Sequence, residues 1–266
     1  MDKYHQILVK YWGFSSFRAL QEDIIKSAGD GKDTLGLMPT GGGKSITFQV
    51  PALANEGICL VITPLIALMK DQVENLKKRG VNAIAIYSGL TAHEINIAFD
   101  NCVFGKVKFL YLSPERLGTE LFKQRVVNMQ VNLIAVDESH CISQWGYDFR
   151  PSYLKIAEIR NLLPQVPVLA LTATATPEVV EDIQERLGFK EKNVFRKSFE
   201  RKNLAYYVKE YEDKYKYLIK YIQKSQGTGV VYVRNRKRTK EIAQLLFQNK
   251  ISADYYHAGL SNDVRS

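Results

Sequence analysis

The chain has 266 residues, a formal net charge of +9, and a composition of 45% hydrophobic and 24% charged residues. This composition is ordinary for a folded globular protein. A membrane-spanning chain is excluded, because no run approaches the roughly 18 apolar residues that a span requires. The excess of Lys and Arg favours a polyanionic partner such as nucleic acid, with solubility alone as the alternative.

The three cysteines, Cys59, Cys102 and Cys141, form no Cys-x-x-Cys pair. Their odd number and wide spacing argue against a disulfide framework and against a zinc site in this stretch, and they fit a reducing compartment. The first residues, MDKYHQILVKYWGF, lack the long apolar core of a signal peptide. We therefore expect a protein that is not secreted and that is either cytoplasmic, associated with the nucleoid, or nuclear.

Short apolar runs of β-forming residues recur along the first part of the chain. They span residues 34–38, 58–63, 83–87, 109–112, 133–136 and 168–172. Most are apolar throughout, which is typical of strands covered on both faces. Helix-length stretches separate them, and this alternation predicts an α/β protein with a parallel sheet and helices on both faces.

One of these stretches, LIALMKDQVENLKKRG, has the spacing of an amphipathic helix that Gly80 can end. The residues expected on its apolar face are Leu65, Leu68, Val73 and Leu76.

The stretch MPTGGGKSITFQVPAL follows the first predicted strand directly. Consecutive glycines allow backbone N–H groups to converge on phosphate oxygens, and the helix that begins here directs its positive end at the same anion. Lys44 would reach the β and γ phosphates, and the Ser45 hydroxyl would coordinate Mg²⁺. The pattern GxxxxGK followed by Ser or Thr is met except at its first glycine position, which holds Met38. The alternative is a glycine turn capped by a helix. The predicted nucleotide-binding residues of this loop are Thr40, Gly41, Gly42, Gly43, Lys44 and Ser45.

Asp137 and Glu138 follow the strand predicted over 133–136, so they lie at the carboxyl edge of the sheet, where ligands of open α/β sheets bind. Asp137 would hold Mg²⁺, usually through water, while Glu138 would orient or activate the attacking water. Acids at a strand end also serve merely to complement a helix dipole, but the phosphate loop favours metal and water chemistry. His140 is expected to act as a relay, with a structural role as the alternative.

The stretch ESHCISQWGYDFRPSY brings four aromatic residues close to these acids, with Gly and Pro among them. Their spacing is not that of an apolar helix face, and it indicates a surface that touches a partner. Flat rings stack on any nucleobase, each contributing roughly 1–3 kcal/mol. We predict this role for Trp145, Tyr147 and Phe149. The alternative, that a ring packs against the sheet, is stronger for Tyr153, which can begin a helix.

The composition changes after Phe195, where a segment dense in Lys and Tyr follows. A second, shorter series comes after it, with strands predicted over 204–208, 229–233 and 253–257 and helices ending near Ser225 and spanning 239–248. We therefore expect two domains, 1–200 and 201–266, of which the second is incomplete because so short a unit is marginal alone.

The stretches DESH, MPTGGGKS, ALTATAT and YWGFSSFRALQ together resemble the RecQ family of superfamily-two DNA helicases, and the resemblance covers essentially the whole chain. It implies a P-loop, RecA-like parallel sheet and the start of a second RecA-like domain. It also implies ATP and Mg²⁺ as cofactors, with Lys44, Asp137 and Glu138 as the catalytic residues and Ser45 and Asp137 at the metal.

In the stretch YWGFSSFRALQ, the resemblance implies that Phe14 stacks on adenine, that Gln21 hydrogen-bonds the edge of the base, and that Arg18 reaches towards the nucleotide. TPLIALMKDQ and YLSPERL resemble segments that track the DNA backbone, and LTATAT resembles the segment that couples hydrolysis to domain movement. The implied DNA-sensing and coupling residues are His140, Gln144, Trp145, Tyr147, Phe149, Arg150, Thr172 and Thr174.

The resemblance implies a 3′-to-5′ DNA helicase, a DNA-stimulated ATPase that translocates on single-stranded DNA and unwinds duplexes in repair or recombination. Its expected partners are single-stranded and forked DNA, without a membrane or zinc, and a monomer is expected. An RNA helicase of the DEAD or DEAH type and a non-catalytic nucleic-acid binding or annealing module are the alternatives. Because the family's γ-phosphate arginine is not found within residues 1–266, this stretch is expected to bind nucleotide but to hydrolyse it poorly.

Overall fold

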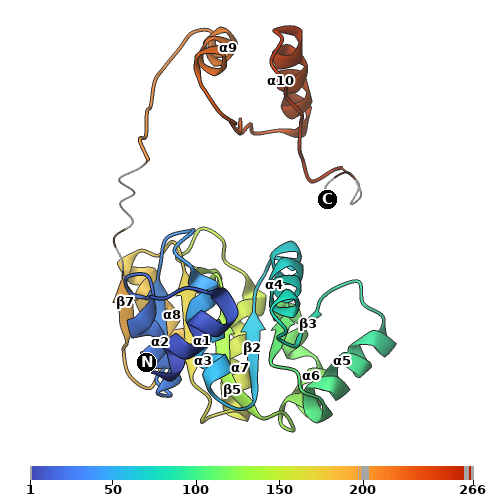
Figure 1. Ribbon diagram of the computed structural model, residues 1–266. Coiled ribbons are helices and arrows are strands. Elements are labelled where there is room, and N and C mark those ends of the chain that lie inside the picture. The colour runs from blue at the N-terminus through green and yellow to red at the C-terminus, as the bar shows by residue number, and fades with distance from the viewer. Residues whose placement is uncertain (1, 197, 199–203, 261–263, 265–266) are drawn as a thin grey trace. The chain divides into compact units, whose positions relative to one another are not determined.

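The computed structural model describes residues 2–196, 198, 204–260 and 264. The chain divides into two compact units, Met1–Glu200 and Arg201–Ser266. The first unit contains a sheet of seven parallel strands in the order β3-β4-β2-β5-β6-β1-β7 (Figure 1). The strands are β1 (Thr34–Leu37), β2 (Ile58–Ile62), β3 (Ala83–Ile86), β4 (Phe109–Leu112), β5 (Val131–Val136), β6 (Val168–Thr172) and β7 (Val194–Arg196). Six of these strands were predicted, and the short edge strand β7 was not.

Helices cover both faces of this sheet, as the alternating pattern predicts (Figure 1). They are α1 (Lys3–Trp12), α2 (Gln21–Gly29), α3 (Lys44–Ala54), α4 (Ile66–Lys78), α5 (Ala92–Phe104), α6 (Glu120–Val126), α7 (Lys155–Leu162) and α8 (Pro177–Arg186). Three short 3₁₀ segments join them: η1 (Pro114–Gly118), η2 (Ser139–Ile142) and η3 (Pro151–Leu154).

The apolar strands build two cores, one on each face, because successive side chains of a strand point in opposite directions. On β2, Leu60 belongs to the cluster that packs against α5 to α8. Its neighbour Val61 belongs to the cluster that packs against α2 to α4. Tyr111 and Leu112 divide in the same way on β4. Both faces of the sheet are therefore covered by helices and excluded from solvent, which explains why these strands carry apolar residues throughout.

The apolar face of α4 differs from the prediction. Its buried residues are Met69, Val73 and Leu76, spaced at i, i+4 and i+7. Leu65 precedes the helix in an extended conformation and is 50% exposed, so its side chain lies before the first turn. Gly80 follows the helix end with φ of +75°, as its predicted role requires.

Three loops meet at the carboxyl edge of the sheet. β6 lies between β5 and β1, and all three strands are parallel, so the segments that follow them emerge side by side. The backbone N–H of Met38 donates to the carbonyl oxygen of Thr172 at 3.0 Å. This topology places three segments at one rim of the sheet. They are the phosphate loop (residues 40–45), the acidic pair (Asp137 and Glu138) and the threonine segment (residues 171–176).

The second unit contains α9 (Lys214–Lys224) and α10 (Arg236–Gln248), in agreement with the two predicted helices. The strands predicted over 204–208, 229–233 and 253–257 are wrong: these segments are irregular in the structure. Strands of a parallel sheet require neighbours and cover on both faces. Here Val208 and Tyr232 are 99% and 91% exposed, and α9 buries none of its described residues.

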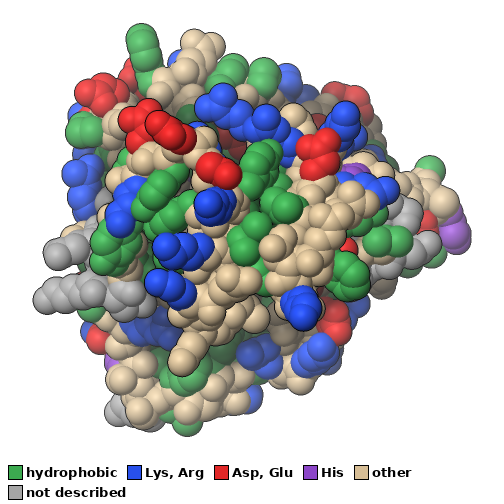
Figure 2. All heavy atoms as spheres, turned by 90° about the horizontal axis from the view of Figure 1, so that it is seen from above, with side chains coloured by type: hydrophobic (Ala, Val, Ile, Leu, Met, Phe, Trp, Pro, Cys, Tyr) green, Lys and Arg blue, Asp and Glu red, His purple; other side chains and the backbone are tan. Residues whose placement is uncertain are grey.

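The surface is mixed in character. Figure 2 shows Lys and Arg side chains spread over the face in view, with acidic and hydrophobic side chains between them. Within the described ranges, no helix is long and apolar enough to cross a membrane.

Candidate nucleotide-binding site

The phosphate loop joins β1 to α3 in a conformation that requires glycine. Gly41 and Gly43 have φ of +77° and +78°, in the left-handed region, and the N–H of Gly42 donates to the Pro39 carbonyl at 2.9 Å. A Cβ on Gly43 would lie 2.3 Å from Nε2 of Gln21, so this position has no room for a side chain. The loop leads directly into the N-terminus of α3, where free N–H groups and the helix dipole favour an anion.

Lys44, the first residue of α3, lies beside the acidic pair that follows β5. Its Nζ is 3.6 Å from Oε1 of Glu138, and the two side chains are 16% and 27% exposed. Such partial burial strengthens the attraction relative to an exposed pair. The predicted phosphate ligand and the predicted water-activating carboxylate are thus brought together.

Asp137 is held rigidly at the end of β5. The buried Tyr153 hydroxyl donates to the Asp137 carbonyl at 2.9 Å, and the Glu138 N–H donates to Asp137 Oδ1 at 3.0 Å. Burial, reinforced by the negative charge of Glu138, raises the pKa of Asp137 to about 6, while the Lys44 ammonium opposes the shift. The Tyr153 ring is therefore packed in the core, the alternative to base stacking that was considered for it, and its hydroxyl supports the backbone of Asp137.

The donors at this rim fit a magnesium ion. Mg²⁺ prefers oxygen ligands, and it commonly binds through one or two protein oxygens together with phosphates and water. The Asp137 carboxylate at the end of β5 is a ligand of this kind, and so is the hydroxyl of Ser45 in the first turn of α3. A cation there would also favour the charged form of Asp137, which burial disfavours.

Glu138 has a strained backbone. Its φ and ψ are +48° and +45°, a left-handed conformation that is uncommon outside glycine. Such a conformation costs of order 1–3 kcal/mol and is characteristic of functional sites. It turns the chain sharply from β5 into η2, so that Glu138 and His140 both face the rim.

His140 connects the acidic pair to two other predicted segments. Its Nδ1 lies 2.9 Å from Oγ1 of Thr172 and 3.5 Å from Oε2 of Glu138. The Tyr147 ring stacks on the imidazole at 4.9 Å, and its hydroxyl lies 3.2 Å from Oγ1 of Thr174. Burial lowers the pKa of His140, so the ring is neutral at physiological pH. A continuous chain of polar contacts therefore runs from Glu138 to the aromatic segment, residues 145–153.

The aromatic segment is divided between surface and interior. Trp145 and Tyr147 are 77% and 78% exposed, whereas Phe149 is half-buried and Tyr153 is fully buried. A Cβ on Gly146 would lie 2.9 Å from the His140 carbonyl oxygen, so glycine allows the segment to pack closely on η2.

The polar members of this segment also lie at the surface. Gln144 is exposed, and Arg150 is half-buried, with its Nη2 2.9 Å from Oδ2 of Asp148. The resulting ion pair lowers the pKa of Asp148. The backbone N–H of Arg150 donates to the Cys141 carbonyl in η2 at 2.8 Å.

The segment before α2 contacts the phosphate loop directly. Arg18 Nη1 donates to the Gly41 carbonyl at 2.9 Å, and Gln21 Nε2 donates to the Gly42 and Gly43 carbonyls at 3.2 and 3.1 Å. Gln21 is 2% exposed, and its Oε1 accepts from the Arg18 N–H at 2.8 Å. Both residues therefore hold the loop, a contact that sequence spacing does not reveal. The Gln21 amide, which was expected to hydrogen-bond the base, is occupied by these contacts in the structure. Phe14 is 50% exposed and stands free to stack.

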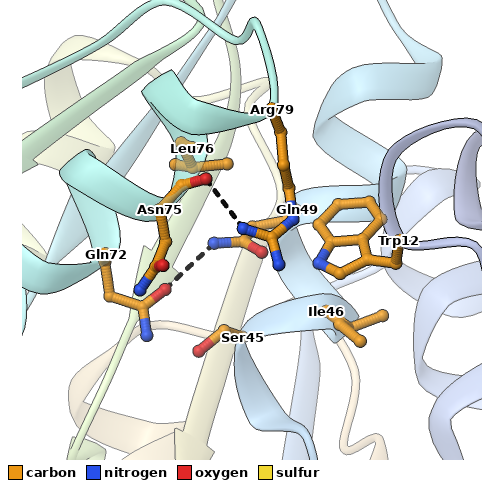
Figure 3. Close-up of a pocket in the computed structure, with 8 residues that line it drawn as sticks. All are labelled: Trp12, Ser45, Ile46, Gln49, Gln72, Asn75, Leu76 and Arg79. Carbon is orange, nitrogen blue, oxygen red and sulfur yellow. Dashed lines mark hydrogen bonds between the residues drawn. The ribbon is translucent and has the colours of Figure 1, made fainter.

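A polar cavity of about 230 Å³ lies beside Ser45, between α1, α3 and α4 (Figure 3). Gln49 Nε2 donates to Gln72 Oε1 at 3.1 Å, and Arg79 Nη1 donates to the Asn75 carbonyl at 2.8 Å. The Arg79 guanidinium also lies 5.9 Å from the centre of the Trp12 ring. Sequence reasoning missed this cavity, because its residues come from three separate helices.

Comparison with known proteins agrees with this geometry. The model of the DEAD/DEAH box helicase family matches residues 18–183. The chain is 41% identical over 268 residues to the ATP-dependent DNA helicase RecQ of Bacillus subtilis (strain 168), covering 100% of this chain and 45% of that protein. It is 38% identical over 260 residues to the RecQ helicase of Haemophilus influenzae, covering 97% of this chain and 42% of that protein. The chain thus spans less than half the length of these curated relatives.

The crystal structure of the DUF1998 helicase MrfA has a TM-score of 0.71 at 16% identity, covering 93% of this chain and 41% of that one, and it supports the fold alone. The RecA-like helicase sheet expected from the resemblance is confirmed in the first unit. The chain belongs to the DEAD/DEAH box helicase family and, along its whole length, is similar to RecQ helicases.

Proposed function

We propose that the chain is the nucleotide-binding part of a RecQ-type, ATP-dependent DNA helicase that moves 3′ to 5′ along single-stranded DNA and unwinds forked duplexes in repair or recombination. The observation that carries this proposal is the distance of 3.6 Å between Lys44 and Glu138, together with the polar chain from Glu138 to an exposed aromatic segment. We propose that it acts as a monomer, either in the cytoplasm in association with the nucleoid or in the nucleus.

In this mechanism the N–H groups of Gly41 and Gly43 and the Lys44 ammonium bind the phosphates of ATP, and the Gly42 N–H joins them when it leaves its hydrogen bond to the Pro39 carbonyl. Lys44 then leaves its ion pair, and Glu138 becomes free to orient a water molecule for attack on the γ phosphate. Ser45 and Asp137 would hold Mg²⁺, which would neutralise the negative charge that develops on the phosphates. Phe14 stacks on the base, while Arg18 and Gln21 link that segment to the loop.

The coupling to DNA uses the remaining contacts at the rim. A strand that stacks on Trp145 or Tyr147 shifts the ring that covers His140. His140 touches both Glu138 and Thr172, so such a shift is transmitted to the water-orienting carboxylate and to the threonine segment. DNA binding would in this way raise the rate of hydrolysis.

The test is single-turnover hydrolysis of ATP with no nucleic acid, with single-stranded DNA, and with RNA of the same sequence. The proposal requires DNA to accelerate hydrolysis more than RNA does. Equal or greater stimulation by RNA would favour an RNA helicase, and DNA binding without any ATP binding would favour a non-catalytic module. Unwinding of duplexes with a 3′ tail but not a 5′ tail, measured on a longer chain, checks the polarity.

A further inference from the structure

The turn after η2 brings together three side chains of the types that bind Zn²⁺ in proteins. Cys141 Sγ lies 3.8 Å from Nε2 of His140 and 3.7 Å from Oδ2 of Asp148. One ligand atom from each of the three residues lies within 4.8 Å of the others. His140 and Cys141 are buried, whereas Asp148 is half-buried, so the cluster opens to solvent on the Asp148 side.

These distances are those of a tetrahedral site. With Zn–S near 2.3 Å and Zn–N or Zn–O near 2.0–2.1 Å, the edges from sulfur to the other two ligands of a tetrahedron are about 3.6 Å. The two edges to sulfur in this structure, 3.8 and 3.7 Å, exceed this value only slightly. All three ligand atoms lie within 4.8 Å of one another, so a cation would draw the side chains inward to be held by all three.

Hydrogen bonding orients the imidazole for this role. The Thr172 hydroxyl donates its single hydrogen to the Thr174 carbonyl at 3.1 Å, so at its 2.9 Å contact with His140 it must accept from Nδ1–H. The Nε2 lone pair of His140 then faces Cys141. A histidine whose other nitrogen donates to a fixed oxygen is the usual arrangement in metal sites.

We propose that His140, Cys141 and Asp148 form a binding site for a thiophilic divalent cation of the Zn²⁺ class, with the fourth position open to water. On binding, the thiol proton leaves to solvent and the sulfur–metal bond takes its place. The absence of a Cys-x-x-Cys pair does not exclude such a site, because its ligands are two chain neighbours and a residue from the following turn.

The consequence of binding rests on the proposed function. Asp148 now pairs with Arg150, so a bound cation competes with the guanidinium. It also fixes His140 beneath Tyr147, and with it the polar chain that links the aromatic segment to Glu138. Occupancy should therefore weaken the stimulation of hydrolysis by DNA.

The test is a titration of the 266-residue chain with Co²⁺ in excess Mg²⁺, which keeps oxygen-ligand sites filled. A thiolate-to-cobalt absorption band in the near ultraviolet should saturate at one equivalent and disappear when Zn²⁺ is added. The cluster of Asp2, His5 and Glu22 cannot produce this band, because it contains no sulfur. Absence of the band in the wild-type chain would overturn the proposal.

Variants assign the band. Cys141→Ser should abolish it, while Cys102→Ser, which alters another buried cysteine, should retain it. If Cys141→Ser does not fold, Asp148→Asn should keep the band but weaken Co²⁺ binding at least about tenfold. A band that survives Cys141→Ser, or an affinity unchanged in Asp148→Asn, would refute the assignment.

Saturating Zn²⁺ should then lower the DNA stimulation of ATP hydrolysis in the wild-type and Cys102→Ser chains. Unchanged stimulation in the metal-loaded chain would contradict the regulatory effect. If the chain neither binds nor hydrolyses ATP, the proposed function fails, whereas the absorption band still reports on the metal site.

Discussion

Nζ of Lys44 lies 3.6 Å from Oε1 of Glu138, although one residue follows β1 and the other follows β5. The two strands are separated in the sheet only by β6, so the loops at their carboxyl ends face each other. The proposed function assigns the lysine to the bound phosphate and the carboxylate to the attacking water.

Lys44→Ala should weaken ATP binding by about 10- to 100-fold, because charge-assisted hydrogen bonds contribute about 1.5–3 kcal/mol. The affinity is measured by titration with a fluorescent ATP analogue. Lys32→Ala, which alters an exposed lysine just before β1, is the matched control and should leave the affinity unchanged. Equal affinities for the wild type and Lys44→Ala would contradict the assignment of the loop.

Glu138→Gln should retain ATP binding but slow single-turnover hydrolysis by at least about 100-fold, the usual contribution of a positioned general base. The amide keeps the size of the side chain but removes its charge and its ability to take a proton, and with them the ion pair to Lys44. Glu56→Gln, on the loop before β2, serves as a control. A hydrolysis rate within a few fold of the wild type would exclude Glu138 as the base.

Asp137→Asn should stabilise the fold at pH 8 but not at pH 3.5. Burial raises the pKa of Asp137 from 3.8 to about 6, so the stability that its protonated form contributes is complete below pH 3.8 and is lost as the pH rises through about 6. The asparagine avoids the buried charge, and the gain in the free energy of unfolding is at most about 3 kcal/mol.

Urea denaturation of Asp137→Asn at the two pH values measures this difference, with Asp23→Asn, an exposed position, as the control. A variant that is less stable than the wild type at pH 8 would show that the surroundings of Asp137 stabilise its charged form.

Asp137→Asn should also weaken the Mg²⁺ dependence of ATP binding, because an amide is a poorer ligand than a carboxylate.

Trp145→Ala should weaken binding to single-stranded DNA by about 5- to 150-fold, which corresponds to the loss of 1–3 kcal/mol of stacking. Fluorescence anisotropy with a labelled oligonucleotide measures the affinity. Phe104→Ala removes an equally exposed ring from the end of α5 and should have no effect. Similar losses of DNA affinity in the two variants would show that any exposed ring contributes to binding, and would contradict a specific role for residues 145–153.

Much of this architecture is encoded locally. The strands of the first unit other than β7 were predictable because continuous apolar runs favour strands buried on both faces. The phosphate loop was predictable because consecutive glycines precede Lys44 and Ser45 directly after a strand, and in the structure Gly41 and Gly43 have the positive φ that favours glycine. The position of Asp137 and Glu138 followed from the rule that ligands bind at the carboxyl ends of parallel strands.

The strands expected in the second unit show the limit of local pattern. Residues 229–233 have strand-forming composition, yet Tyr232 is 91% exposed and the segment is irregular. The same kind of apolar run becomes a strand in the first unit because neighbouring strands accept its hydrogen bonds and helices cover it.

The sequence by itself determined the strands and helices of an α/β sheet, the phosphate loop and the acidic pair, since each can be recognised from residues close together in the chain. Only the tertiary structure decided that Gln21 holds the loop carbonyls, that Tyr153 supports Asp137, and that Cys141 meets Asp148. These contacts join segments whose approach is set by strand order and packing, which no short-range pattern contains.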